Sequence, residues 1–84
     1  MGVNMTIAIP GWDTFSNGGM KAIFVDSVRF PRVYADDPDY CEIRPIDFPL
    51  WRDEIIKLGC NVDMWLAGLD ALEKDPNLWI GVSY

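Results

Sequence analysis

The alternation of apolar and polar side chains predicts a strand near the start of the chain. In residues 3–9 the apolar side chains Val3, Met5, Ile7 and Ile9 are separated by Asn4, Thr6 and Ala8. A period of two places one set on a buried face and the other set on the opposite face. Pro10 and Gly11 end the run, so we expect a strand with one buried face.

A second apolar run, residues 20–30, contains Ile23, Phe24 and Val25, which all favour strands. The stretch before it, residues 12–19, ends in Ser-Asn-Gly-Gly, and such residues readily adopt the positive φ of a chain reversal. This pattern predicts a second strand that pairs antiparallel with the first and ends before Pro31.

Two shorter segments also have the pattern of strands. Residues 40–46 can extend with one face formed by Tyr40, Glu42 and Arg44 and the other by Cys41 and Ile43. Pro45 restricts this segment to a sheet edge or to the end of a strand. Residues 78–84 alternate again, with Leu78, Ile80 and Val82 in register, and are expected to form the last strand.

Between these segments the spacing of apolar residues changes to that of a helix. In residues 48–58, Trp51, Ile55 and Leu58 share one face, Asp47 precedes the run as an N-cap, and Gly59 follows it as a stop. We also expect an ion pair between Asp53 and Lys57 on this helix.

A second helix is predicted over residues 62–75, with Asn61 as its cap and Pro76 as its limit. Its apolar stripe consists of Val62, Trp65, Leu66, Leu69 and Leu72. The opposite side carries Asp63, Asp70 and Lys74.

The predicted order is β-β-β-α-α-β within a single domain, residues 1–84. The simplest packing is an α+β fold, a small two-layer sandwich in which two helices cover one face of an antiparallel or mixed four-stranded sheet. Phe24, Phe30 and Trp79 have two interpretations at this stage: they fill gaps in the core, or they form a contact surface.

The charge of the chain is uneven. The net charge is −6; residues 1–33 hold two acids against three bases, whereas residues 34–84 hold eleven acids against four bases. Affinity for phosphates comes from Lys and Arg, so direct binding to nucleic acid is disfavoured and a basic partner is favoured.

Catalytic and metal chemistry find little support. The chain has no histidine and no phosphate-binding glycine motif, and Cys41 lies between the acids Asp39 and Glu42, which disfavours its use as a nucleophile. An EF-hand register counted from Asp36 fails at its third, fifth, sixth and twelfth positions. We therefore expect no enzymatic activity, no cofactor and no metal, and we expect Cys41 and Cys60 to be free thiols.

No apolar run approaches the length needed to cross a bilayer, and the first residues lack the pattern of a secretory signal. The expected location is cytoplasmic, without attachment to a membrane.

The acidic stretch that begins near Tyr34 is the main candidate for function. Its candidate partner-binding residues are Tyr34, Asp36, Asp37, Asp39, Tyr40 and Glu42. One interpretation is a solvated turn that starts before Pro38. The other is a binding face: in an extended segment, carboxylates two residues apart are separated by about 6.6 Å, close to the spacing of neighbouring phosphates.

These features favour an acidic, non-catalytic inhibitor that acts as a nucleic-acid mimic on a larger protein with a basic surface. In size and charge the chain is similar to phage-encoded anti-defence inhibitors, including anti-CRISPR proteins, and to nuclease immunity proteins. The alternative is a structural subunit or a homodimer that buries exposed aromatic residues and an edge strand in self-assembly.

Overall fold

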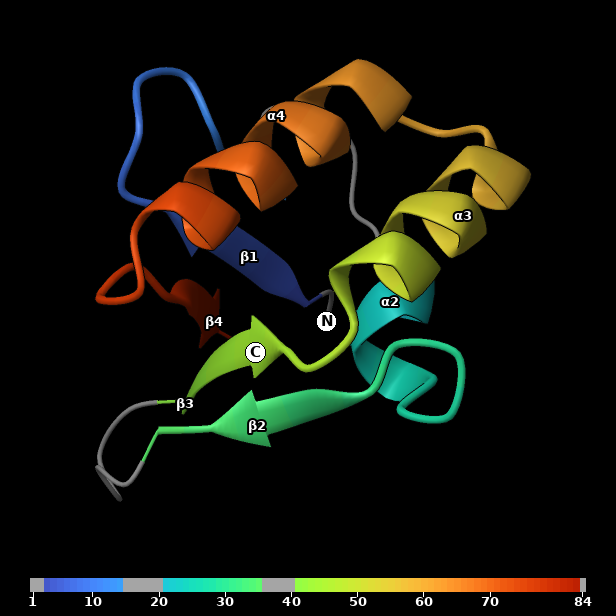
Figure 1. The fold of residues 1–84 in the computed structure, drawn as a ribbon, viewed down its shortest axis with the longest axis horizontal. Coiled ribbons are helices and arrows are strands. Elements are labelled where there is room, and N and C mark those ends of the chain that lie inside the picture. The colour runs from blue at the N-terminus through green and yellow to red at the C-terminus, as the bar shows by residue number, and fades with distance from the viewer. Residues whose placement is uncertain (1–2, 15–20, 36–40, 84) are drawn as a thin grey trace.

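The computed structural model describes residues 3–14, 21–35 and 41–83 and confirms the α+β fold (Figure 1). Within these residues the elements follow in the order β1 (Asn4–Ile7), α2 (Lys21–Val25), β2 (Arg32–Tyr34), β3 (Cys41–Pro45), α3 (Phe48–Leu58), α4 (Val62–Lys74) and β4 (Ile80–Ser83).

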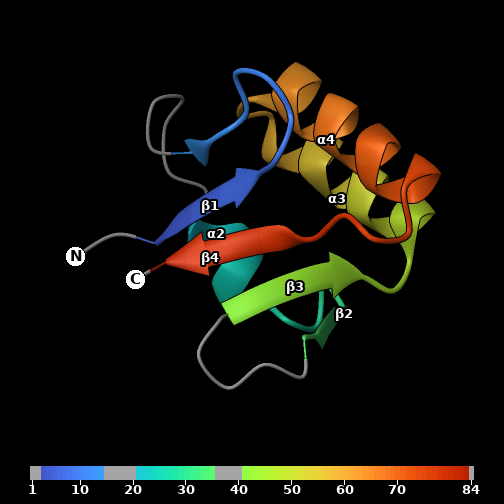
Figure 2. The same ribbon diagram turned by 90° about the vertical axis from the view of Figure 1, so that its left-hand side faces the viewer.

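The four strands form one antiparallel sheet in the order β1-β4-β3-β2. The register aligns Ile7, Ile80 and Ile43 across three strands, and all three side chains are buried. Figure 2 shows β1, β4 and β3 side by side, with α3 and α4 together on one side of them. The strands predicted near both ends of the chain and around Ile43 are thus confirmed.

Both long helices occur where the apolar spacing predicts them. Asp47 accepts a hydrogen bond from the Leu50 amide at 3.0 Å, and Gly59 ends α3 with a left-handed φ of 71°. The predicted cap of α4 is wrong in detail: Asn61 occupies the N-cap position with φ 51° but makes no side-chain cap bond. Lys57 pairs with Glu54 at 3.3 Å, one position away from the partner expected for it.

The strand predicted over residues 20–30 is wrong. Its first part is the short helix α2, and a turn then leads into β2, which the sequence pattern did not reveal. Strand periodicity would bury Ile23 and Val25 together, whereas Ile23 is fully buried and Val25 is 61% exposed. This run was expected to pair with β1, but both edges of β1 are occupied. β4 pairs with one edge, and Asp13 bridges to Thr6 at the other.

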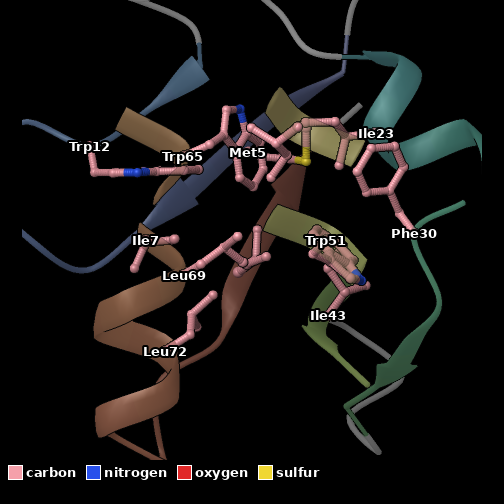
Figure 3. Close-up of a cluster of buried hydrophobic side chains, with 12 residues drawn as sticks. Met5, Ile7, Trp12, Ile23, Phe30, Ile43, Trp51, Trp65, Leu69 and Leu72 are labelled. Atoms are coloured by element: carbon pink, nitrogen blue, oxygen red, sulfur yellow. The ribbon is translucent and has the colours of Figure 1, made fainter. Parts of the chain in front are cut away.

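Aromatic side chains occupy the centre of the core between sheet and helices (Figure 3). Trp12 meets Trp65 edge to face at 4.8 Å between ring centroids, and Phe30 meets Trp51 at 5.1 Å. The indole N–H of Trp12 donates to the Met64 carbonyl at 2.7 Å, and that of Trp51 donates to the Pro31 carbonyl at 2.8 Å. Phe30 is therefore a core residue, while Phe24 and Trp79 are half-buried.

Gly68 allows Trp12 to lie against α4. A Cβ atom at this position would come within 2.6 Å of the Trp12 indole nitrogen and 2.9 Å of the Ile7 side chain. The absence of a side chain at one helical position thus fixes how closely the segment after β1 packs on α4.

Leu69→Ala should lower the free energy of unfolding by about 2 to 5 kcal/mol, because Leu69 is fully buried and its truncation leaves a cavity. Urea denaturation followed by tryptophan fluorescence measures the change. Ile56→Ala is the matched control: Ile56 lies on α3 but is 55% exposed, and its truncation should cost less than about 1 kcal/mol. Equal losses in the two variants would contradict the described packing.

Candidate partner-binding face

The structure describes two of the predicted binding residues, Tyr34 and Glu42. Tyr34 lies on β2 opposite Ile43 and is 57% exposed, whereas Glu42 lies on β3 opposite Gly81 and is half-buried. Directly opposed residues share a face of the sheet and successive residues alternate. Tyr34 therefore shares the face of Ile43, and Glu42 projects from the other face.

The remaining candidates, Asp36, Asp37, Asp39 and Tyr40, belong to the connection between β2 and β3 and lie outside the described residues. Of the four predicted carboxylates, the structure therefore places only Glu42. What the structure establishes is that the two strands flanking these acids pair in register, with the Ala35 amide donating to the Glu42 carbonyl at 2.9 Å.

Arg32 is a buried base that satisfies the C-terminal end of α2. Its guanidinium donates to the carbonyl oxygens of Ile23 at 2.6 Å, Phe24 at 2.7 Å and Phe30 at 3.0 Å. Desolvation lowers the pKa of Arg32, although an arginine side chain stays protonated in proteins. Helix carbonyls without an intrahelical partner need such donors.

Arg44 has the same role at the end of α4. Its guanidinium donates to the carbonyl oxygens of Leu72 at 2.5 Å, Leu78 at 2.6 Å and Asp75 at 3.1 Å. The positive charge thus lies at the negative end of the helix dipole. It also links β3 to the segment that leads into β4.

Three further bases pair with acids on the helical side of the molecule. Arg29 lies 2.7 Å from Glu54, Lys57 approaches the same carboxylate, and Arg52 on α3 contacts Asp70 and Glu73 on α4. The hydrogen bonds that Arg52 donates to Glu73 and to Asp70, in that order of effect, raise the pKa of Arg52. The hydrogen bond from Arg29 lowers the pKa of Glu54.

Five of the seven basic residues are therefore engaged within the protein, either with helix carbonyls or with carboxylates. The acids outnumber the bases by six in the whole chain, so the excess negative charge is left for solvent or a partner. The arrangement suits recognition of a cationic surface and opposes recognition of phosphate.

Among residues 3–14, 21–35 and 41–83, no group of three acidic, cysteine or histidine side chains is placed to hold a metal ion. Cys41 is half-buried and Cys60 is exposed, and the expectation of free thiols is confirmed. In the same part of the chain, no helix is long and apolar enough to cross a membrane.

The roles of Arg32 and Arg44 were not predicted. Each guanidinium binds backbone carbonyls, and no residue type marks where such carbonyls will meet a distant side chain. A weak signal exists for Arg32, because it stands between the apolar residues Phe30 and Val33 in a short segment.

Arg32→Met should destabilise the protein by about 2 to 4 kcal/mol. The substitution keeps most of the side-chain volume but leaves several buried carbonyls without a donor, each at a cost of about 1 to 3 kcal/mol, partly offset by removal of a desolvated charge. Arg29→Met, which removes an exposed ion pair, should cost less than about 1 kcal/mol. Chemical denaturation compares them, and equal stability of wild type and Arg32→Met would refute the capping role.

The stabilisation from Arg29 and Glu54 should disappear in acid. The folded-state pKa of Glu54 is lowered, so its contribution is fully present above the ordinary value of 4.5 and is lost as the pH falls through the lower folded value. The difference in unfolding free energy between wild type and Arg29→Gln should be constant well above pH 4.5 and should shrink as the pH falls below that value. A difference that grows on acidification contradicts this assignment.

Comparisons of the chain with protein-family models, with curated proteins and with solved structures found no match. The functional argument therefore rests on the charges and geometry of this chain.

Proposed function

We propose that this protein is a non-catalytic inhibitor that binds the basic, nucleic-acid-binding surface of a larger protein. The observation that carries the proposal is the division of charge: the bases are mostly engaged within the fold, while the net charge is −6. An unopposed negative field accelerates encounter with a cationic surface and disfavours encounter with nucleic acid.

The binding face in this proposal is centred on the acidic connection between β2 and β3. Asp36, Asp37 and Asp39 supply the charge, with Glu42 on the adjoining strand. Tyr34 and Tyr40 supply rigid amphipathic rings, on which arginine side chains of a partner can stack. Because Tyr34 and Glu42 project from opposite faces of the sheet, a partner that contacts both must surround this end of the two strands.

The targets that fit are cytoplasmic proteins whose Lys- and Arg-lined grooves hold DNA or RNA. A carboxylate row in such a groove competes with the phosphate backbone without being cleaved. Phage inhibitors of bacterial defence and immunity proteins of nucleases share this physical logic.

A structural subunit is the second candidate. It is supported by exposed apolar side chains around β2, namely Val33, Tyr34 and Ile46. Sedimentation separates the two functions: an inhibitor is expected to have the mass of one chain, 9.6 kDa, and to co-precipitate with basic nucleic-acid-binding proteins. A stable dimer indifferent to such proteins supports assembly.

Removing the acidic charges should slow association with the partner isolated by co-precipitation. The variant Asp36→Asn, Asp37→Asn, Asp39→Asn and Glu42→Gln should associate about tenfold more slowly or worse, because complementary charges act mainly on the association rate. The rate of the wild type should fall steeply between about 50 and 500 mM salt.

A matched pair of double variants separates local from overall charge. Asp36→Asn with Asp37→Asn should slow association more than Asp53→Asn with Asp63→Asn, which removes the same charge from exposed helical positions. Equal rates would mean that net charge alone acts and that the proposed face is a solvated turn.

A further inference from the structure

The outer edge of β2 carries backbone groups that face away from the sheet. Hydrogen bonds from Ile46 N to Pro31 O at 3.1 Å and from Ala35 N to Glu42 O at 2.9 Å fix the pairing with β3. In an antiparallel ladder these inward-facing positions alternate with outward-facing ones. The N–H and C=O groups of Arg32 and Tyr34 therefore point away from β3, and no described helix or strand runs along this edge (Figure 1).

The opposite edge of the sheet is protected. Asp13 bridges to Thr6 on β1, the Met5 amide donates to the Thr14 hydroxyl at 2.7 Å, and that hydroxyl donates to Asn4 at 3.0 Å. Proteins usually block edge strands because an open edge accepts another chain. In the described residues, this sheet blocks the β1 edge and leaves the β2 edge open.

The side chains at the open edge are apolar and accessible. Val33 is 45% exposed and Tyr34 is 57% exposed. Ile46, which extends the same ladder through its bond to Pro31, is 60% exposed. A strand added here would find apolar contacts on both of its faces, because Val33 and Tyr34 project in opposite directions.

The negative charge of the chain favours a basic segment over a second copy as the occupant of this edge. A second copy would bring another −6 to a strand that Asp36 and Asp37 follow closely in the sequence. The base on this strand, Arg32, already donates hydrogen bonds to backbone carbonyls inside the fold. An extended segment with Lys or Arg at alternate positions gains both the ladder hydrogen bonds and the charge complementarity.

We propose that the β2 edge binds an extended basic segment of the partner by strand addition, with Arg32 and Tyr34 supplying the backbone hydrogen bonds. This inference rests on the proposed function, because it specifies how the basic partner is held. The backbone pairing supplies a salt-independent part of the affinity, and the acids supply the salt-dependent part.

The test uses a nine-residue peptide of alternating lysine and valine as the probe. Two control peptides separate the contribution of charge from that of backbone hydrogen bonds. A peptide of alternating glutamate and valine reverses the charge. A lysine–valine peptide with an N-methylated backbone keeps the charge but lacks the N–H donors of the ladder. The lysine–valine peptide should bind most tightly and should slow amide hydrogen exchange at Arg32 and Tyr34 by about tenfold or more.

Two variants at one position test the edge itself. Tyr34→Ala removes the ring and keeps the N–H, whereas Tyr34→Pro removes both; the lost N–H faces outward, and Val33 before it is already extended. Tyr34→Pro should bind the lysine–valine peptide about fivefold more weakly than Tyr34→Ala, the effect of one lost hydrogen bond. If Tyr34→Pro does not fold, amide hydrogen exchange at Arg32 and Tyr34 of the wild type, with and without the lysine–valine peptide, tests strand addition by itself.

Strand addition is overturned if the lysine–valine peptide does not bind, or if it binds the two Tyr34 variants equally well. It is also overturned if the N-methylated peptide binds as tightly as the unmodified one. A doubled mass of the protein with protected Arg32 and Tyr34 amides would identify a second copy as the occupant instead. The proposed function fails separately. It is refuted when the Asp36, Asp37, Asp39 and Glu42 variant associates with the partner as fast as the wild type, whatever happens at the edge.

Discussion

The burial of one guanidinium, that of Arg32, determines how the middle of this chain is organised. It binds the carbonyls at the end of α2 and lies 5.4 Å from the Phe24 ring and 5.8 Å from the Trp51 ring. A five-residue helix cannot stabilise itself in water, so α2 depends on this contact and on the burial of Ile23. The same side chain belongs to β2, and its burial therefore ties the edge strand to α2 and α3.

The other arginines extend this principle to the whole molecule. Arg44 joins β3 to the end of α4, and Arg52 joins α3 to α4. Positive charge thereby holds elements together, and acids take part as well, because Glu54, Asp70 and Glu73 pair with bases and Asp47 caps α3. Removal of a solvent-exposed acid outside these contacts costs little stability.

The sequence predicts elements whose signals are local and misses those that depend on distant contacts. α3 and α4 are evident because caps, glycine, proline and apolar spacing all lie within each segment, and β1 and β4 alternate clearly. The run around Ile23 has strand propensity, yet Arg32 and Phe30 hold it as a helix and a turn, which is a tertiary effect. For the same reason residue type alone singles out Tyr34 as a candidate, whereas the edge beside it cannot be found from the sequence, since an edge is defined by the order of all four strands.

That strand order has a consequence for synthesis of the protein. β4, made from residues 80–83, lies between β1 and β3, so β1 cannot join the β2–β3 pair until these residues have been made. Until then Ile7 and Ile43 lack Ile80, which lies between them in the sheet. Closure of this sheet therefore depends on contacts between residues far apart in the sequence, which is typical of folds that form slowly.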